Sequence, residues 1–239
     1  MLAHQSPAEL AILFEFWRPA IKAGALLLAF GGTRENFERT SFEPRIFITD
    51  PRLRTRDHQR EHQSMTGVFQ AVRHWLHSDA GAWEFIHFAE SDHLPLIADL
   101  NEQQVKRMNQ ERADVLAFHL QRIDGTSHPH YLYHRADPRF HAFFESVSVR
   151  QDTSVVLAAL GAGSFWRREA FEAVAAIDEP FPMYFEVYLP TLAHHLGFRL
   201  RDWSDQNQYV LNKGDRGAEI DDARRAGAWT LHPVKTFSA

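Results

Sequence analysis

The chain has 239 residues, of which 44% are hydrophobic and 24% charged, a composition typical of a globular protein and not of a disordered or fibrous one. It contains no cysteine, which excludes disulfides, iron–sulfur clusters, thiolate zinc sites and cysteine nucleophiles, so any metal must bind oxygen or imidazole. The net charge of −5 provides no overall attraction for nucleic acid, and the longest apolar run, residues 23–30, is far shorter than the ~20 residues of a membrane-spanning helix. We therefore expect one domain over residues 1–239, with no nucleic-acid partner and no transmembrane segment.

The N-terminus lacks the basic and apolar regions of a secretion signal because Pro7 and Glu9 interrupt it, so we expect a cytoplasmic location. A local basic stretch is expected to be either a solvated loop or a contact for a phosphate-bearing ligand; it consists of Arg52, Arg54, Arg56 and Arg60. The chain also has 15 histidines. Those between His119 and His141 lack the regular spacing of a metal site, and we expect them on the surface.

Helices and strands alternate from the N-terminus onward. Ser6, Pro7 and Glu9 form a helix-start signature, which predicts a helix from Pro7; the residues before it resemble the end of a strand. Next come expected strands over residues 25–30 and 45–49, a helix over residues 65–76 behind Ser64, and a mostly apolar strand over residues 83–89.

The second half continues this alternation. We expect helices over residues 101–112, 167–176 and 185–196, and strands over residues 114–118, 155–160 and 198–203. Residues 121–150 show no clear periodicity and are expected to form an irregular excursion with at most a short helix, while residues 161–164 are expected to be a tight connection. Alternating strands and helices favour an α/β fold with a mostly parallel sheet covered on both faces.

Glu90 and Asp92 directly follow the strand expected at residues 83–89. Ligands of open α/β sheets bind at the carboxyl ends of strands. Two carboxylates separated by one residue suit a hard divalent cation, which in turn neutralises a diphosphate. The alternative is that both carboxylates cap the following turn.

Four segments resemble, in chain order, motifs of nucleotide-sugar glycosyltransferases of the A-type fold. Phe85 to His93 resembles their strand and D-x-D-type motif, and Gly161 to Phe171 is similar to their acceptor-side pattern of small residues, an aromatic residue, an arginine and a helix. Tyr184-Phe185-Glu186 resembles the position of the catalytic carboxylate in inverting members, and His232-Pro233-Val234-Lys235 resembles the C-terminal histidine of the metal site. Two departures are a glutamate at position 90 and a first strand reduced to at most Met1 to His4.

The resemblance implies a three-layer α/β/α sandwich with a Rossmann-like central sheet. It implies a metal-assisted, inverting transfer of a sugar from a nucleoside-diphosphate sugar to a hydroxyl of a glycan or small-molecule acceptor. The metal, Mn²⁺ or Mg²⁺, would bind Asp92 with Glu90 and His232, and Glu186 would act as the general base. For Glu186 the alternative is a first-turn residue favoured by the helix dipole, and for His232 an exposed position in the tail.

The same resemblance assigns donor binding to His4 and Gln5 after the first strand, to Asp50 after the third, and to Glu90 and Lys235 beside the diphosphate. Plainer alternatives remain: a strand-to-helix loop for His4 and Gln5, a turn former for Asp50 before proline, and a surface position for Lys235. Three aromatic residues are expected either to stack on a sugar or to pack in the core, namely Trp166, Tyr184 and Tyr188.

Two other classes of protein remain open. A non-catalytic nucleotide- or glycan-binding domain of the same fold is supported by the reduced first strand. A metal-dependent nucleotidyltransferase should carry a glycine-rich basic loop after its first strand, which this sequence lacks, and a metal-dependent hydrolase should have more clustered ligands than Glu90, Asp92, His93 and His232.

Overall fold

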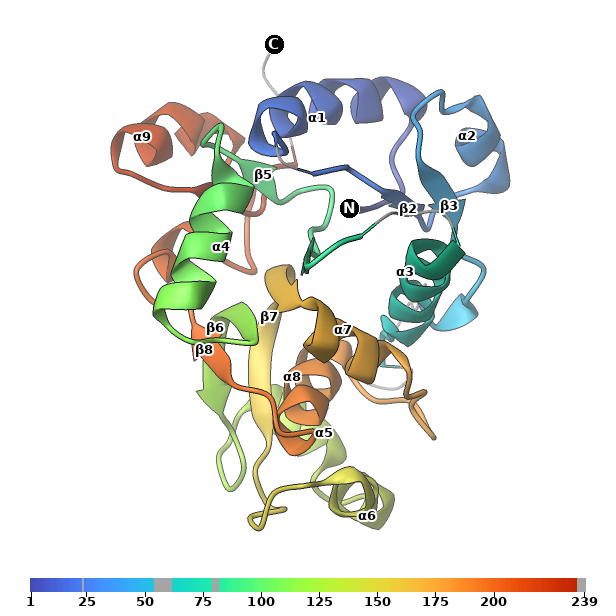
Figure 1. The fold of residues 1–239 in the computed structure, drawn as a ribbon, viewed down its shortest axis with the longest axis vertical. Helices are drawn as coiled ribbons and strands as arrows, with labels where there is room; N and C mark the ends of the chain where they lie inside the picture. Colours follow the sequence, from blue (N-terminus) through green and yellow to red (C-terminus); the bar gives the residue numbers. More distant parts are fainter. Residues whose placement is uncertain (23, 54–61, 79–81, 236–239) are drawn as a thin grey trace.

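The computed structural model describes residues 1–22, 24–53, 62–78 and 82–235 and has a mixed α/β fold (Figure 1). The helices are α1 (Pro7–Ala20), α2 (Arg34–Arg39), α3 (Thr66–Ser78), α4 (Leu100–Gln110), α5 (Pro129–His134), α6 (Pro138–Val147), α7 (Arg168–Ala175), α8 (Phe185–His195) and α9 (Ile220–Arg225). The strands are β1 (Leu2–Ala3), β2 (Leu28–Phe30), β3 (Arg45–Phe47), β4 (Phe85–His87), β5 (Leu94–Pro95), β6 (Val115–Arg122), β7 (Leu157–Arg167), β8 (Leu200–Asp202) and β9 (Thr230–Leu231).

The first sheet is parallel throughout, with the strand order β1-β2-β3. Side chains alternate between its two faces, so Leu28 and Phe30 belong to the core beneath α1 whereas Ala29 belongs to the core that includes α3. In Figure 1, α1 and α2 lie on one side of this sheet and α3 on the other. The expected helix start is confirmed, because Ser6 and Glu9 form a complete capping box.

The second sheet is mixed, with the order β4-β7-β6-β8. Strand β7 is antiparallel to both β4 and β6, while β6 and β8 are parallel. The expectation of a mostly parallel sheet is therefore wrong for this part of the chain. The tight connection expected at residues 161–164 is also wrong, because these residues continue β7 to Arg167.

Two glycines inside β7 misled the sequence interpretation, and each is required by packing. A Cβ on Gly161 would lie 2.0 Å from Cε2 of Phe185, so this position is small because the ring of α8 packs directly on the strand. Gly163 has a φ of +79°, and a Cβ there would lie 2.3 Å from Cε1 of His93. Both glycines allow close approach within a strand instead of ending it.

Residues 88–90 connect the two sheets. The N–H of Phe88 donates to the carbonyl of Ser164, the residue of β7 next to those that pair with β4, at 2.8 Å. The N–H of Leu2 in β1 donates to the carbonyl of Ala89, also at 2.8 Å. Leu2 and Glu90 also form a parallel bridge. The chain therefore reaches Glu90 in the middle of the combined structure, between β1 and β7.

The expectation of an irregular excursion over residues 121–150 is wrong, since this region contains α5 and α6. Each helix has a proline at its first turn and a side chain at its N-cap, His128 for α5 and Asp137 for α6. A proline in the first turn and an aspartate at the N-cap are ordinary helix-start signals. The aromatic and histidine content of the region hid the helical periodicity.

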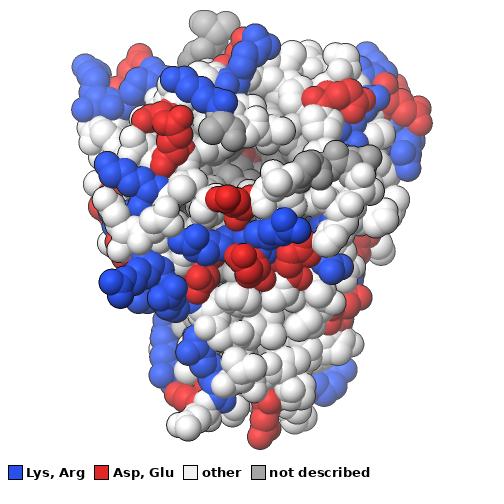
Figure 2. All heavy atoms as spheres, viewed as in Figure 1, with Lys and Arg blue, Asp and Glu red and all other residues white. Residues whose placement is uncertain are grey.

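Positive and negative side chains are interspersed over the face of the described residues shown in Figure 2. Of the basic stretch, Arg52 pairs with Asp50, and Arg54, Arg56 and Arg60 lie outside the described residues. No helix among the described residues is both long enough and apolar enough to cross a membrane.

Candidate functional site

The three predicted metal ligands lie together. Glu90, Asp92 and His232 each offer a ligand atom, and these atoms all lie within 4.8 Å of one another. Nε2 of His232 lies 3.3 Å from Oδ1 of Asp92. The two carboxylates are partly exposed and the imidazole is 6% exposed, so the cluster opens to solvent on its acidic side. The structure thus brings together residues that are about 140 positions apart in the chain.

A turn after β4 presents the two carboxylates. The N–H of His93 donates to the carbonyl of Glu90 at 3.0 Å, which closes the turn, and the carbonyl of Asp92 accepts a 2.8 Å hydrogen bond from the N–H of Val234. This second bond attaches the C-terminal segment to the turn. The position of His232 beside Asp92 therefore depends on backbone pairing between the two segments.

The orientation of the His232 ring suits metal binding. Its Nδ1 hydrogen-bonds to the carbonyl of Leu211, which requires the proton on Nδ1 and directs Nε2 toward Asp92, where it could bind a metal once it carries no proton. Metal-bound histidines commonly donate their second ring nitrogen to a backbone carbonyl in this way. Two carboxylates and one imidazole form a donor set that fits Mn²⁺ or Mg²⁺.

Asp92 shifts the pKa of both Glu90 and His232. Burial and the neighbouring Asp92 raise the pKa of Glu90 to about 7. Burial opposes protonation of His232, but the hydrogen bond and charge of Asp92 prevail and raise the pKa of its imidazole. The cluster has an excess of acidic groups, which a divalent cation would neutralise.

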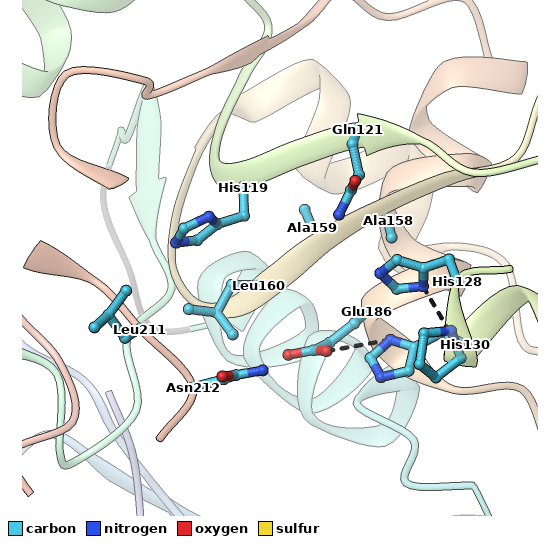
Figure 3. A pocket seen from close by; sticks show the side chains of 11 residues that line it. His119, Gln121, His128, His130, Ala158, Ala159, Leu160, Glu186, Leu211 and Asn212 are labelled. Atoms are coloured by element: carbon cyan, nitrogen blue, oxygen red, sulfur yellow. Dashed lines mark hydrogen bonds and ion pairs between the residues drawn. The ribbon is translucent and has the colours of Figure 1, made fainter. Parts of the chain in front are cut away.

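Glu186 lies in the first turn of α8 and lines a cavity (Figure 3). Its Oε1 accepts a 3.0 Å hydrogen bond from the N–H of Gly161, and its Oε2 lies 3.4 Å from Nδ1 of His130. Burial raises the pKa of Glu186 to about 7, and the charge of Glu90 acts in the same direction. A partly buried carboxyl with a pKa near neutrality is suited to proton transfer.

The first-turn position of Glu186 is also what the helix-dipole alternative expected. However, its carboxyl group accepts a hydrogen bond from the N–H of Gly161 in β7 and lies near His130 of α5. No side-chain hydrogen bond caps the N-terminus of α8. The carboxyl therefore does not act as an N-cap of its own helix. Its partners hold it at the cavity wall.

Of the residues predicted to bind the donor, Gln5 reaches the cluster turn. Its side-chain amide donates to the hydroxyl of Ser91, between Glu90 and Asp92. His4 precedes it in the loop and is exposed. The loop before α1 and the turn after β4 therefore form one continuous edge of the site.

Asp50 and Lys235 are less closely connected to the cluster. The guanidinium of Arg52 binds both oxygens of Asp50, at 2.6 Å for the shortest contact, and lowers the pKa of this partly buried carboxyl despite the opposing effect of burial. Among the described residues no hydrogen bond or ion pair joins Asp50 to the cluster. Lys235 is exposed one residue after Val234, and its N–H donates to Asp215.

His93 does not join the ligand cluster. Its side chain is completely buried, and neither ring nitrogen has a hydrogen-bond partner. Its ring lies near those of His87, Phe118 and His232, and burial holds the pKa of His93 well below its usual value. It acts as a neutral packing residue behind the metal-ligand turn.

Sequence reasoning missed the histidines of the cavity. We expected residues between His119 and His141 on the surface, but His134 is 2% exposed, and His119, His128 and His130 line the cavity that contains Glu186. The only local signal is the N-cap role of His128 before Pro129. Their convergence on Glu186 depends on how α5 packs against α8, which no spacing rule reveals.

The three aromatic residues have different environments. Trp166 and Tyr188 are almost fully buried and pack in the core, as the plainer alternative expected. Tyr184 is only partly buried, and its ring centroid lies 4.3 Å from that of His130. Of the three, Tyr184 lies nearest to the Glu186 cavity.

No protein-family model matches this sequence, and no curated protein matches it significantly. The site must therefore be interpreted from its own geometry.

Proposed function

We propose that this protein is a metal-dependent glycosyltransferase that moves a sugar from a nucleoside-diphosphate sugar to a hydroxyl group of a glycan or small-molecule acceptor. The observation that carries this proposal is the proximity of two different chemical groups. A cluster of Glu90, Asp92 and His232 suits a divalent cation, and the charge of Glu90 acts on the partly buried carboxyl of Glu186. A metal site beside a group that accepts protons near pH 7 is what this transfer requires.

Glu186 is the general base of the proposed reaction. It takes the proton of the acceptor hydroxyl while the acceptor oxygen forms a bond to the anomeric carbon and the bond from that carbon to the diphosphate oxygen breaks. The products are the glycosylated acceptor, with inverted configuration, and the nucleoside diphosphate. Gly161 orients the Glu186 carboxyl for this step through the 3.0 Å hydrogen bond, and Nδ1 of His130 lies 3.4 Å from the other carboxyl oxygen.

The residues of the cluster bind the departing end of the donor. When bound there, Mn²⁺ or Mg²⁺ supplies positive charge that stabilises the leaving diphosphate. Gln5 connects the loop before α1 to this turn, which supports a role for His4 and Gln5 next to the nucleotide. Lys235 follows the segment attached to Asp92 and is placed in this proposal beside the phosphates. Asp50 has the weakest support, because Arg52 already neutralises it.

The proposal includes the complete fold of this class, a three-layer α/β/α sandwich whose central sheet combines the two sheets through residues 88–90. The hydrogen bonds of Phe88 to Ser164 and of Leu2 to Ala89 support this continuity. The cores on opposite faces of β2 support the layering on one side of the molecule.

Calorimetric titration with uridine and guanosine diphosphates, with and without Mn²⁺, tests the proposed function. We expect binding of at least one diphosphate only when Mn²⁺ is present, and loss of that binding in Asp92→Asn. The matched control is Asp221→Asn, which removes an exposed carboxylate of α9 outside the cluster and should leave binding unchanged.

Failure of a folded protein to bind either diphosphate would contradict the proposal and favour a binding domain without transferase activity. Metal-independent binding that survives Asp92→Asn would equally contradict the role of the cluster. Turnover of a donor without any acceptor, with release of free sugar, would instead indicate a hydrolase.

A further inference from the structure

The cavity that contains Glu186 has a volume of about 310 Å³, at the lower end of the range for small-molecule pockets. It lies between β6, β7, the beginnings of α5 and α8, and the segment between β8 and α9 (Figure 3). Its lining consists of His119, Gln121, His128, Pro129, His130, Ala158, Ala159, Leu160, Glu186, Leu211 and Asn212. Leu211 connects it to the metal cluster, because its carbonyl hydrogen-bonds to His232. A molecule in this cavity therefore lies beside Glu186, and the cavity wall contacts the metal ligand His232 through Leu211.

The lining contains no lysine or arginine, and Glu186 is its one acidic residue. Burial lowers the pKa of His130 to about 4 and also lowers the pKa of His128, so these imidazoles are neutral at pH 7. A carboxylate, sulfate or phosphate on a ligand would find no lysine or arginine in this lining and would be repelled by Glu186. The cavity therefore discriminates against anions.

The polar groups that do line the cavity suit hydroxyls. Figure 3 shows the amide of Asn212 turned toward the carboxyl of Glu186 and the amide of Gln121 on the side of β6. In the described part of the chain neither amide has a side-chain hydrogen-bond partner. Each amide offers both donors and an acceptor, which matches the dual character of a hydroxyl group.

His128 adds a third neutral group. Its Nδ1 accepts a 3.3 Å hydrogen bond from the N–H of His130, so the proton of the neutral ring lies on Nε2. Aliphatic side chains complete the lining, namely Ala158, Ala159, Leu160 and Leu211. Neutral hydrogen-bonding groups beside aliphatic surface match a sugar ring, which has both hydroxyl edges and C–H faces.

We infer that this cavity binds the acceptor as an uncharged, hydroxyl-rich unit of carbohydrate type, with one hydroxyl at Glu186 and others at Gln121 and Asn212. This inference rests on the proposed function only where it identifies the ligand as the acceptor of the transferred sugar. The chemistry of the ligand, a neutral polyol and not an acidic sugar or a phosphorylated compound, rests on the lining alone.

Matched sugar pairs provide the test. The methyl glycosides of glucose, galactose and mannose are compared with the methyl glycosides of the corresponding uronic acids, which differ only in a carboxylate at carbon 6. Binding to the full chain is measured at pH 8 by saturation-transfer NMR and calorimetry, without donor. We expect at least one neutral glycoside to bind at millimolar concentration and its uronide to bind about tenfold more weakly or not at all.

Three variants locate the site. Gln121→Leu and Asn212→Leu each remove one hydrogen-bonding group at similar side-chain volume. Each is expected to lower the affinity for the neutral glycoside about fivefold. Glu186→Gln is expected to reduce the difference in affinity between the neutral glycoside and its uronide, because it removes the negative charge that repels the uronide. Gln110→Leu, at an exposed position of α4 outside the cavity, is the matched control and should change nothing.

Preference for the uronides, absence of binding by all three neutral glycosides, or insensitivity to the two leucine variants would overturn the inference. Failure of this inference and failure of the proposed function are distinguishable. Neutral sugar binding without any nucleoside diphosphate binding would retain the ligand class and refute the transferase. Metal-dependent diphosphate binding together with a preference for uronides would support the transferase and refute the neutral ligand class.

Discussion

The backbone N–H of Gly161, within β7, donates a 3.0 Å hydrogen bond to Oε1 of Glu186 at the start of α8. The same glycine lies against the ring of Phe185, where an added Cβ would be 2.0 Å from Cε2. One small residue therefore determines both how closely α8 approaches the sheet and where the carboxyl lies.

The substitution Gly161→Ala is expected to destabilise the fold by about 1–3 kcal/mol, the usual cost of overpacking, and to displace Glu186 as α8 moves away. Urea unfolding measures the first effect, and turnover per folded molecule measures the second. The control is Gly24→Ala, whose Cβ would make an ordinary 3.5 Å contact with Asn101. Equal stability of the two variants would show that the Phe185 ring adjusts without cost.

Replacement of Glu186 by glutamine is expected to lower turnover by about 10²–10⁴-fold, the usual contribution of a general base. Because burial raises the pKa of Glu186 to about 7, wild-type turnover should rise as the pH increases through 7 and the carboxyl loses its proton. The variant should lack this rise. A variant with normal turnover and reduced stability would indicate a purely structural residue.

Binding of Mn²⁺ to the cluster is expected to stabilise the folded protein. At a free concentration of one hundred times Kd, the gain is about 2.7 kcal/mol. For a chain of this size the resulting rise in Tm is about 5–10 °C. Thermal unfolding with and without Mn²⁺ measures this shift, which Asp92→Asn should abolish and Asp221→Asn should retain. A shift of equal size in both variants would locate the ion elsewhere.

Glu179 is almost fully buried, and Nη1 of Arg52 lies 3.3 Å from its Oε1 while Oε2 has no hydrogen-bond partner. Burial raises the pKa of Glu179 from 4.5 to about 7. The folded state thus retains this proton more strongly than the unfolded state, and its stabilising effect is present below pH 4.5 and lost as the pH rises through 7.

In the wild type, the free energy of unfolding should fall by up to about 3 kcal/mol as the pH rises from 4.5 to above 7. Replacement of Glu179 by glutamine, which imitates the protonated carboxyl, should remove this fall. Urea unfolding at several pH values measures the difference. Glu169→Gln, at an exposed position of α7, serves as the control and should keep the wild-type pH dependence. The same slope in Glu179→Gln as in the wild type would show that Arg52 compensates the buried charge.

Local signals predicted much of the secondary structure. The capping box at Ser6 and Glu9 and the apolar spacing of α3 depend on neighbours within a few positions, so they can be recognised without tertiary information. The same signals failed in β7, where Gly161 and Gly163 suggested a turn. Their small size serves contacts with Phe185 and His93, which lie in other elements.

The candidate site divides in the same way. Glu90 and Asp92 could be placed from the sequence alone, because a strand that ends in charged residues marks the edge of a sheet. The resemblance in the sequence also suggested His232 and Glu186. Gln121, His130 and Asn212 could not be recognised, since the cavity they share forms only when residues of β6, α5 and the segment between β8 and α9 meet.

The sequence by itself determined an alternating α/β chain without cysteine, a helix that begins at Pro7, and two carboxylates directly after a strand, because each of these depends on residue type or on neighbours in the chain. Tertiary structure alone decided that β7 runs antiparallel to its neighbours, that His232 lies 3.3 Å from Asp92, and that Glu186 shares a cavity with neutral histidines and amides. The physical reason is that strand pairing and long-range backbone hydrogen bonds, such as that from Val234 to Asp92, join segments whose separation in the sequence carries no local signal.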